Sequence, residues 1–235
     1  MPRKPRKEVS EKTLEINVCA EILAWCRSFP WWHDALWIGM KQNQEAHNGL
    51  DGLLHNAPGF HLLLQFKSPD SVPRDSAPYW FTIGGDQLGH LRLLASHYPD
   101  AVYYVFPFFN TVAQMQRVMA ATSLPMPPPW WRPTARLLSD TWFLPVTSIP
   151  AGSPHRAECY TGYANIHSKS EERKLMKWVD IIGDGKKEPD RHKTDVKKLM
   201  PTKDLLHWIS GIYEKYTPSQ AGQIFRGLTT IYFPE

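Results

Sequence analysis

The segment Phe60-His61-Leu62-Leu63-Leu64-Gln65-Phe66-Lys67 decides the fold of this chain. It follows Asn56-Ala57-Pro58-Gly59, a cluster of residues that break regular structure, and its apolar run has the length of one buried strand. Gln65 and Lys67 project from the same face of that strand, because side chains along a strand alternate. A polar pair at the end of a buried strand is unfavourable unless it is exposed or functional. We therefore expect a core strand that carries an amide and an ammonium group to one end of a sheet.

The flanking sequence predicts helices that alternate with strands. A first helix is expected at residues 10–28, with Ser10 as its N-cap, because apolar residues recur at helical spacing and Pro30 follows. The other expected elements are strands at 35–40, 101–106 and 141–146, a short segment at 49–54, and helices at 85–98, 110–121 and 202–216. The alternation within the first 120 residues indicates an α/β fold with a mixed central sheet flanked by helices.

The 235 residues suffice for one domain with additions or for two small ones. We predict a basic flexible tail at 1–9, a core at 10–122, and a Pro/Trp-rich extension with C-terminal helices at 123–235. Eight prolines fall within residues 125–154, together with the pair Trp130-Trp131. A disordered linker does not carry so many tryptophans, so we expect the extension to pack on the core.

The net charge of +4 comes from 27 basic and 23 acidic residues. Four residues of the tail supply all of it: Arg3, Lys4, Arg6 and Lys7. The remaining chain is neutral, so composition alone does not indicate nucleic-acid binding. No apolar run approaches the roughly 18 residues of a membrane helix, and no apolar stretch of a secretory signal follows the tail. The three cysteines have neither disulfide-framework nor zinc-ligand spacing, which favours a reducing cytoplasm.

Three residues suggest metal-assisted chemistry. Asp51 begins one expected strand, and Gln65 and Lys67 end the next, so a carboxylate, an amide oxygen and an ammonium group can converge at one sheet end. Oxygen ligands suit Mg²⁺, and a bound metal polarises a phosphate and activates water. The lysine positions or deprotonates that water, or stabilises developing charge. The alternative is that the strand simply reaches solvent at Lys67.

Two further polar residues lie on apolar helix faces. Glu15 falls near the centre of the apolar face of the first helix, where lone carboxylates are rare, and Glu11 lies on the same face one turn earlier. The alternative is that the first turn of the helix overhangs the core and leaves Glu15 in water. Gln87 stands in line with the apolar residues of the 85–98 helix, near its start. It either orients a bound water or phosphate, or caps its own helix.

In this order, the residues Glu15, Asp51, Gln65-x-Lys67 and Gln87 resemble the PD-(D/E)XK phosphodiesterase superfamily, which includes restriction endonucleases and phage-defence nucleases. The resemblance covers residues 10–122 and implies a restriction-endonuclease-like core with Mg²⁺ or Mn²⁺ at one sheet end. It also implies that Asp51, the Gln65 side chain and the Phe66 carbonyl are metal ligands, with Glu15 as the first-helix acid. Lys67 would be the catalytic lysine. Gln65 departs from the usual Glu or Asp, which removes a negative charge and weakens one ligand.

The resemblance implies a Mg²⁺-dependent endonuclease that hydrolyses DNA in a phage-defence or restriction setting. The partners expected are DNA, with RNA as the weaker alternative, and a second copy or a protein of a defence complex. Phosphate contacts are expected from Lys41, Arg74 and Arg92. The rival interpretation is a catalytically inactive binding subunit with the same fold. Gln65 favours that rival, whereas the combination of Glu15, Asp51 and Lys67 favours the enzyme.

Overall fold

A computed structural model describes residues 9–29, 32–40, 58–70, 78–109, 111–120, 136–152, 154–167, 171–182 and 196–234. The helices are α1 (Glu11–Arg27), α3 (Gly85–His97), α4 (Val112–Ala120), α5 (Arg136–Ser139), η2 (Val146–Ser148), α6 (Trp178–Ile182), α8 (Thr202–Lys215) and α9 (Pro218–Ile224). The strands are β1 (Leu36–Gly39), β2 (Gly59–Phe66), β3 (Tyr79–Ile83), β4 (Val102–Pro107), β5 (Thr141–Pro145), β6 (His155–Tyr160), β7 (Tyr163–Ile166), β8 (Glu171–Lys174), β9 (Met200–Pro201) and β10 (Leu228–Pro234).

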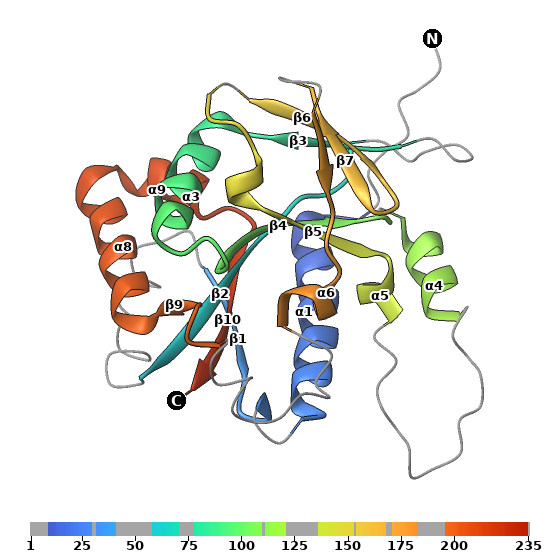
Figure 1. Cartoon of the computed structure of the whole chain (residues 1–235), viewed down its shortest axis with the longest axis horizontal. Coiled ribbons are helices and arrows are strands. Elements are labelled where there is room, and N and C mark those ends of the chain that lie inside the picture. The colour runs from blue at the N-terminus through green and yellow to red at the C-terminus, as the bar shows by residue number, and fades with distance from the viewer. Residues whose placement is uncertain are drawn as a thin grey trace.

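The central sheet has the strand order β1-β10-β2-β4-β5, and β9 pairs with the start of β2. It is mixed, because β2 runs antiparallel to β10 and parallel to β4. The predicted α/β class with a mixed sheet between helices is therefore confirmed (Figure 1). The strands expected around residues 36, 60, 102 and 141 are present as β1, β2, β4 and β5. In α1, Ser10 is the N-cap, and its hydroxyl accepts from the Thr13 N–H at 3.1 Å.

Helices cover both faces of the central sheet (Figure 1). Residues that oppose each other on paired strands lie on the same face. Phe233 contacts the ring of Trp32, which stacks on Trp25 of α1, so α1 covers the face of Phe233. On the opposite face, His61 bonds to Thr202 at the start of α8. The helices α3 and α9 lie on this second face beside α8, as their contacts with each other and with the sheet require.

The last strand of the chain occupies the middle of the central sheet. Seven residues of β10 pair with β2, in a register that sets Leu228 opposite Gln65 and Pro234 opposite Gly59. The predicted division at residues 122 and 123 is therefore not a boundary of the core, since β5 and β10 belong to the same sheet as β2. The strand β2 is therefore paired on both edges, with β10 on one side and β4 on the other. The short segment expected at 49–54 lies outside the described residues.

A second sheet, of order β3-β6-β7-β8, is antiparallel throughout. We predicted no strand in this region of the sequence. The signal was present in β6, where Ala157 and Cys159 are buried and alternate with exposed Arg156 and half-buried Glu158. Its strands are short, and their polar positions face outward, where the Arg156 guanidinium lies 4.0 Å from the centre of the Trp80 ring. Such half-polar strands leave a weaker pattern than the continuous apolar run of β2.

Among the described residues, no helix combines the length and the apolar character that crossing a bilayer requires. The three cysteines are buried and form no disulfide. Burial raises the pKa of the Cys19 and Cys26 thiols, which keeps them protonated at neutral pH. They therefore act as small apolar side chains on the buried face of α1.

A buried histidine joins β2, β10 and α8. The His61 imidazole is fully buried, with Nδ1 3.2 Å from the Thr230 hydroxyl and Nε2 3.1 Å from the Thr202 hydroxyl. Burial lowers the pKa of His61 from 6.5 to about 3, so the ring is neutral in the folded protein. The unfolded chain then binds one more proton between these two values.

We predict that this histidine makes the protein acid-sensitive. Folding stability should fall as the pH drops from about 6.5 towards about 3, by up to about 1.4 kcal/mol per pH unit. His61→Gln cannot titrate and should flatten this part of the pH profile, measured as the free energy of urea unfolding. The matched control is His207→Gln at an exposed position of α8, which should leave the profile unchanged. Parallel acid profiles of His61→Gln and the wild type would contradict the assignment.

Candidate functional site

Gln65, Lys67 and Gln87 meet where β2 ends. Gln65 is fully buried, and the half-buried Lys67 follows two residues later on the same side. The Lys67 Nζ donates to Gln87 Oε1 at 2.8 Å, and it lies 5.9 Å from the centre of the Tyr104 ring. Tyr104 is the lateral neighbour of Gln65 on β4. The structure therefore brings Gln65, Lys67 and Gln87 together at one sheet end. Asp51, the carboxylate expected to converge with Gln65 and Lys67, lies outside the described residues.

The turn between α9 and β10 holds both glutamines. The Arg226 carbonyl accepts from Gln65 Nε2 at 3.0 Å and from Gln87 Nε2 at 3.0 Å. Gln87 Nε2 also donates to the Ile224 carbonyl at 2.8 Å. The amide oxygen of Gln87 thus accepts one hydrogen bond and its amide nitrogen donates two, and none of these bonds caps its own helix. Gln87 therefore fixes Lys67 relative to the α9–β10 turn.

Gly227 allows this turn to approach β2 closely. Its φ of +70° is the left-handed conformation that favours glycine, and its carbonyl accepts from the Phe66 N–H at 2.9 Å. A Cβ at this position would lie 3.0 Å from Gln65 Nε2 and 3.2 Å from the Phe66 carbonyl oxygen. Any side chain here would displace the Gln65 amide or the end of β2. The residue therefore belongs to the site, although the sequence did not reveal it.

Two buried polar atoms at this end of the sheet have no hydrogen-bond partner among the residues that the structure describes. They are Gln65 Oε1 and the Tyr104 hydroxyl. A buried oxygen left without a partner costs about 1–3 kcal/mol, so such atoms are rare unless a ligand or water completes them. The Gln65 amide is not reversed in place, because its nitrogen already donates to the Phe66 carbonyl at 3.1 Å and to that of Arg226. Gln65 Oε1 is thus a buried acceptor open to a donor or a cation.

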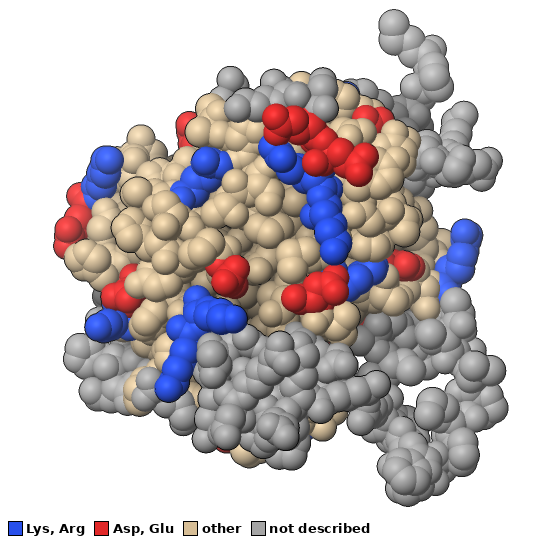
Figure 2. Space-filling view, viewed as in Figure 1, with Lys and Arg blue, Asp and Glu red and all other residues tan. Residues whose placement is uncertain are grey.

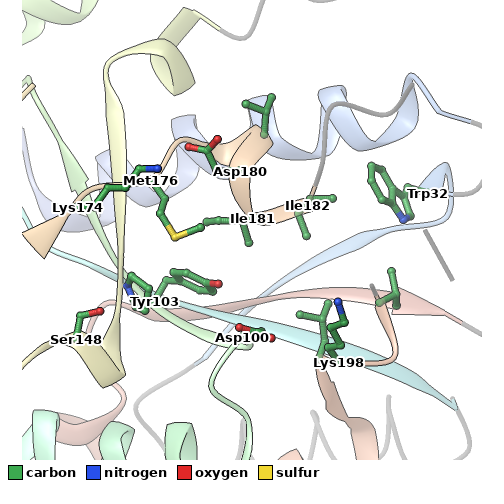
Figure 3. A pocket seen from close by; sticks show the side chains of 14 residues that line it. Trp32, Asp100, Tyr103, Ser148, Lys174, Met176, Asp180, Ile181, Ile182 and Lys198 are labelled. Carbon is green, nitrogen blue, oxygen red and sulfur yellow. The ribbon is translucent and has the colours of Figure 1, made fainter. Parts of the chain in front are cut away.

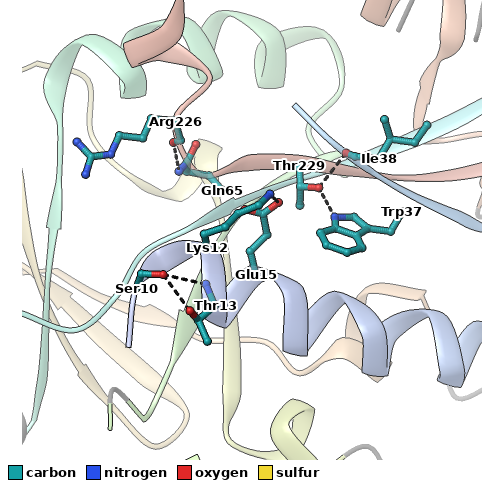
Figure 4. A network of polar contacts seen from close by, with 9 residues as sticks. All are labelled: Ser10, Lys12, Thr13, Glu15, Trp37, Ile38, Gln65, Arg226 and Thr229. Atoms are coloured by element: carbon teal, nitrogen blue, oxygen red, sulfur yellow. Dashed lines mark hydrogen bonds and ion pairs between the residues drawn. The ribbon is translucent and has the colours of Figure 1, made fainter. Parts of the chain in front are cut away.

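Glu15 lies on the other side of the sheet from Gln65. It is 2% exposed, which confirms the predicted burial on the apolar face of α1. Lys12 Nζ donates to its carboxylate at 2.8 Å, and the Thr229 side chain contacts it from β10 (Figure 4). Thr229 is paired with Leu64, the residue before Gln65, so Glu15 and Gln65 approach opposite faces. Glu15 was expected to lie in one group with Gln65 and Lys67. The structure instead places Glu15 on the opposite face of the sheet from Gln65.

Glu11 is an acid of α1 that lies close to Gln65. Its Oε2 is 3.4 Å from the position of a Cβ on Gly227, the same position that lies 3.0 Å from Gln65 Nε2. Glu11 reaches this point because the first turn of α1 lies at the end of the sheet. The sequence placed Glu11 on the same helix face as Glu15, and that spacing was the available signal. Its charge adds to the effect of burial in raising the pKa of Glu15.

The other predicted site residues are separate from this group or not described. Asp51, Lys41 and Arg74 lie outside the described residues. Arg92 lies on α3, and its guanidinium donates to the Ile149 carbonyl at the end of η2. This contact holds α3 against η2, which gives Arg92 a role within the fold.

The donor set fits a divalent cation in part. Gln65 Oε1, the Phe66 carbonyl and the Glu11 carboxylate are oxygen ligands of the kind that Mg²⁺ and Mn²⁺ accept. Within the described ranges, however, no three His, Cys, Asp or Glu side chains cluster to hold a metal. Gln65 Nε2 also points at the Phe66 carbonyl, so both predicted ligands can face one cation only after the amide rotates. Arg226 would then keep its bond from Gln87.

A cavity of about 810 Å³ lies elsewhere, between α6 and the start of β4 (Figure 3). Lys174 and Lys198 line it together with Asp100 and Asp180, so the charges of these four residues balance. None of the residues predicted for the site lines it. A second cavity, of about 570 Å³, opens between α3 and α9 and includes Gln87 in its wall. Of these two cavities, the second adjoins the polar residues at the end of β2.

No protein-family model, curated protein or solved structure matches this chain.

We predict opposite effects from removing two carboxylate charges on α1. Burial is the largest influence on Glu15 and raises its pKa, so stability falls as the pH rises from 4.5 through the folded value. Glu15→Gln should therefore be more stable than the wild type at pH 7. Glu21 Oε2 accepts from the N–H groups of Leu137 and Leu138 at 2.7 and 3.0 Å. Glu21→Ala removes this acceptor and should lose about 0.5–2 kcal/mol, as for other helix caps.

Both variants are compared by urea unfolding at pH 5 and pH 7. The gain of Glu15→Gln should shrink at pH 5, where the wild-type carboxyl binds a proton more readily. A Glu15→Gln variant less stable than the wild type at pH 7 would show that the Lys12 pair outweighs burial.

Proposed function

We propose that this protein is a metal-dependent phosphodiesterase that hydrolyses nucleic acid, with DNA as the substrate expected from the PD-(D/E)XK resemblance. The observation that carries the proposal is the group formed by Gln65, Lys67 and Gln87 at the end of β2. Gln65 Oε1 is buried there and has no hydrogen-bond partner within the described part of the chain. A strand end that positions an amide oxygen and an ammonium group, with a carboxylate at Glu11, is suited to a phosphate and a cation.

Lys67 is the residue proposed to act on the reacting phosphate. Its ammonium is half-buried, which strengthens its interaction with a developing negative charge. Gln87 anchors it from one side and the Tyr104 ring lies on another. A bound cation would polarise the phosphate and activate water. Gln65, the Phe66 carbonyl, Glu11 and Asp51 are the groups proposed to hold it.

The charge distribution sets a limit on how substrate is held. On the face drawn in Figure 2, Lys and Arg side chains of the described residues are interspersed with Asp and Glu. A broad basic surface would favour long duplexes through counterion release. A surface of mixed charge instead favours binding of the substrate mainly through contacts at the proposed site.

One observation favours the second candidate, a binding subunit without catalysis. Gln65 Nε2 donates to the Phe66 and Arg226 carbonyls, so these two carbonyl oxygens accept hydrogen bonds without a cation. A glutamate at this position could donate to neither carbonyl and would need a cation between them. Gln65 is thus compatible with a site that has lost its metal.

We predict that Lys67→Ala loses cleavage by about 10²–10³-fold in kcat/KM, as for removal of one electrostatic contact in a transition state. Plasmid DNA and an RNA of similar length are incubated with Mg²⁺ or Mn²⁺ in parallel. The matched control is Lys174→Ala, since Glu172-x-Lys174 has the same acid-x-lysine pattern but lies on exposed β8. That control should cleave like the wild type. Lys67→Ala with wild-type rates in purified form would exclude the proposed role.

We predict that Gln65→Glu makes stability depend on the metal. Without divalent cation, the new carboxylate faces two carbonyl oxygens and should lower the melting temperature. Addition of Mg²⁺ or Mn²⁺ should restore it, with a larger shift than in the wild type, and cleavage should persist or improve. Asp51→Ala should abolish the shift. If Gln65→Glu is destabilised and neither cation restores it, and the wild type cleaves neither substrate, the binding-subunit interpretation holds instead.

A further inference from the structure

The cavity between α3 and α9 adjoins the proposed site through Gln87. The two helices pack side by side on the same face of the central sheet (Figure 1). Gln87 lines the cavity and also holds Lys67, so a group bound in the cavity would lie next to the phosphate that Lys67 contacts. Its volume of about 570 Å³ lies within the usual range of about 300–1,000 Å³ for small-molecule sites.

The lining of this cavity is polar but nearly uncharged. Gln220 and Gln223 supply amides, and His90 supplies an imidazole in edge-to-face contact with the Tyr216 ring, at 5.1 Å between centres. Burial, and then the charge of Lys215, lower the pKa of His90, which keeps the imidazole neutral. Leu93, which is 62% exposed, adds an apolar surface.

The charge of the lining excludes a phosphate as its occupant. Among the described residues that line the cavity, Asp86 is the one Asp, Glu, Lys or Arg, and its carboxylate would repel an anion. Neutral donors and acceptors beside aromatic and apolar surfaces instead suit a flat, uncharged, hydrogen-bonding group. A nucleobase has these properties.

We propose that the cavity between α3 and α9 binds an unpaired nucleobase next to the scissile phosphate, which makes single-stranded nucleic acid the substrate class. This inference rests on the proposed function. A paired base cannot enter the cavity without leaving its stack, at a cost of a few kcal/mol. The backbone of the bound strand would then run past Lys67, while its base occupies the cavity.

Gly89 offers a direct test, because it lies on the exposed side of α3 in the cavity wall. A Cβ at Gly89 would have no atom within 4 Å, so a larger side chain fills the cavity without disturbing the fold. Gly211 of α8 is the matched control, since it is also helical and exposed and has the same open surroundings. Leucine should stabilise both helices relative to glycine.

The experiment measures binding by fluorescence anisotropy in Ca²⁺, separately from cleavage. The probes are a labelled 20-nucleotide single strand of mixed sequence, its duplex, and a 20-unit abasic strand, in DNA, with the single strand repeated in RNA. The wild type should bind the single strand at least about tenfold more tightly than the duplex or the abasic strand. Gly89→Leu should weaken single-strand binding about tenfold or more and leave abasic binding unchanged. Gly211→Leu should match the wild type throughout, and both variants should keep the wild-type melting temperature or exceed it.

Each result separates this inference from the proposed function. Unchanged single-strand binding in Gly89→Leu overturns the inference, as do equal affinities for single strand and duplex, or for strands with and without bases. Failure of the wild type to bind any single strand also overturns it. If Gly89→Leu loses binding but the wild type cleaves nothing with Mg²⁺ or Mn²⁺, the base-binding cavity stands and the phosphodiesterase does not. If the wild type cleaves and Gly89→Leu binds normally, the phosphodiesterase stands and the cavity does not.

Discussion

The pairing of β10 with β2 is the constraint on which both the fold and the site depend. It completes the hydrogen bonding along one edge of the central strand, and it brings the α9–β10 turn to the point where β2 ends. The Arg226 carbonyl then holds Gln65 and Gln87, and through Gln87 it holds Lys67. The orientation of Gln65, Lys67 and Gln87 therefore follows from one long-range strand pair.

The parts of the fold that could be predicted are those that local patterns determine. The apolar run before Gln65 and the helical spacing around Glu15 each specify one element, and β2 and α1 match them closely. Position within the sheet was not predictable, because the apolar segment of β10 would pair equally well at an edge. In β10, Thr229 and Thr230 are buried among apolar residues, and this pattern does not indicate which strands pair with it. The strands of the second sheet were not predicted, because their outward-facing polar residues interrupt the apolar pattern of the sequence.

The candidate site shows the same division. Gln65, Lys67 and Gln87 stood out because polar side chains on apolar patterns are conspicuous in a sequence. The groups that orient them are main-chain carbonyls and a glycine, and these leave no trace in residue chemistry. The sequence also assigned the first-helix acid by burial, which selected Glu15. The geometry instead places Glu11 close to Gln65, beside Gly227. Burial on the apolar face of α1 therefore did not indicate which acid lies close to the end of β2.

The central position of β10 has a consequence for how the chain acquires its structure during synthesis. Gln65 and Arg226 are separated by 161 residues, so β2 leaves the ribosome long before its central partner exists. At about 5–20 residues per second, translation of that interval takes roughly 8–30 seconds. For that time the edge of β2 that β10 later covers is an open template for pairing with other chains. A chaperone or a temporary internal partner could cover this edge over the interval, and the site assembles only when β10 is inserted.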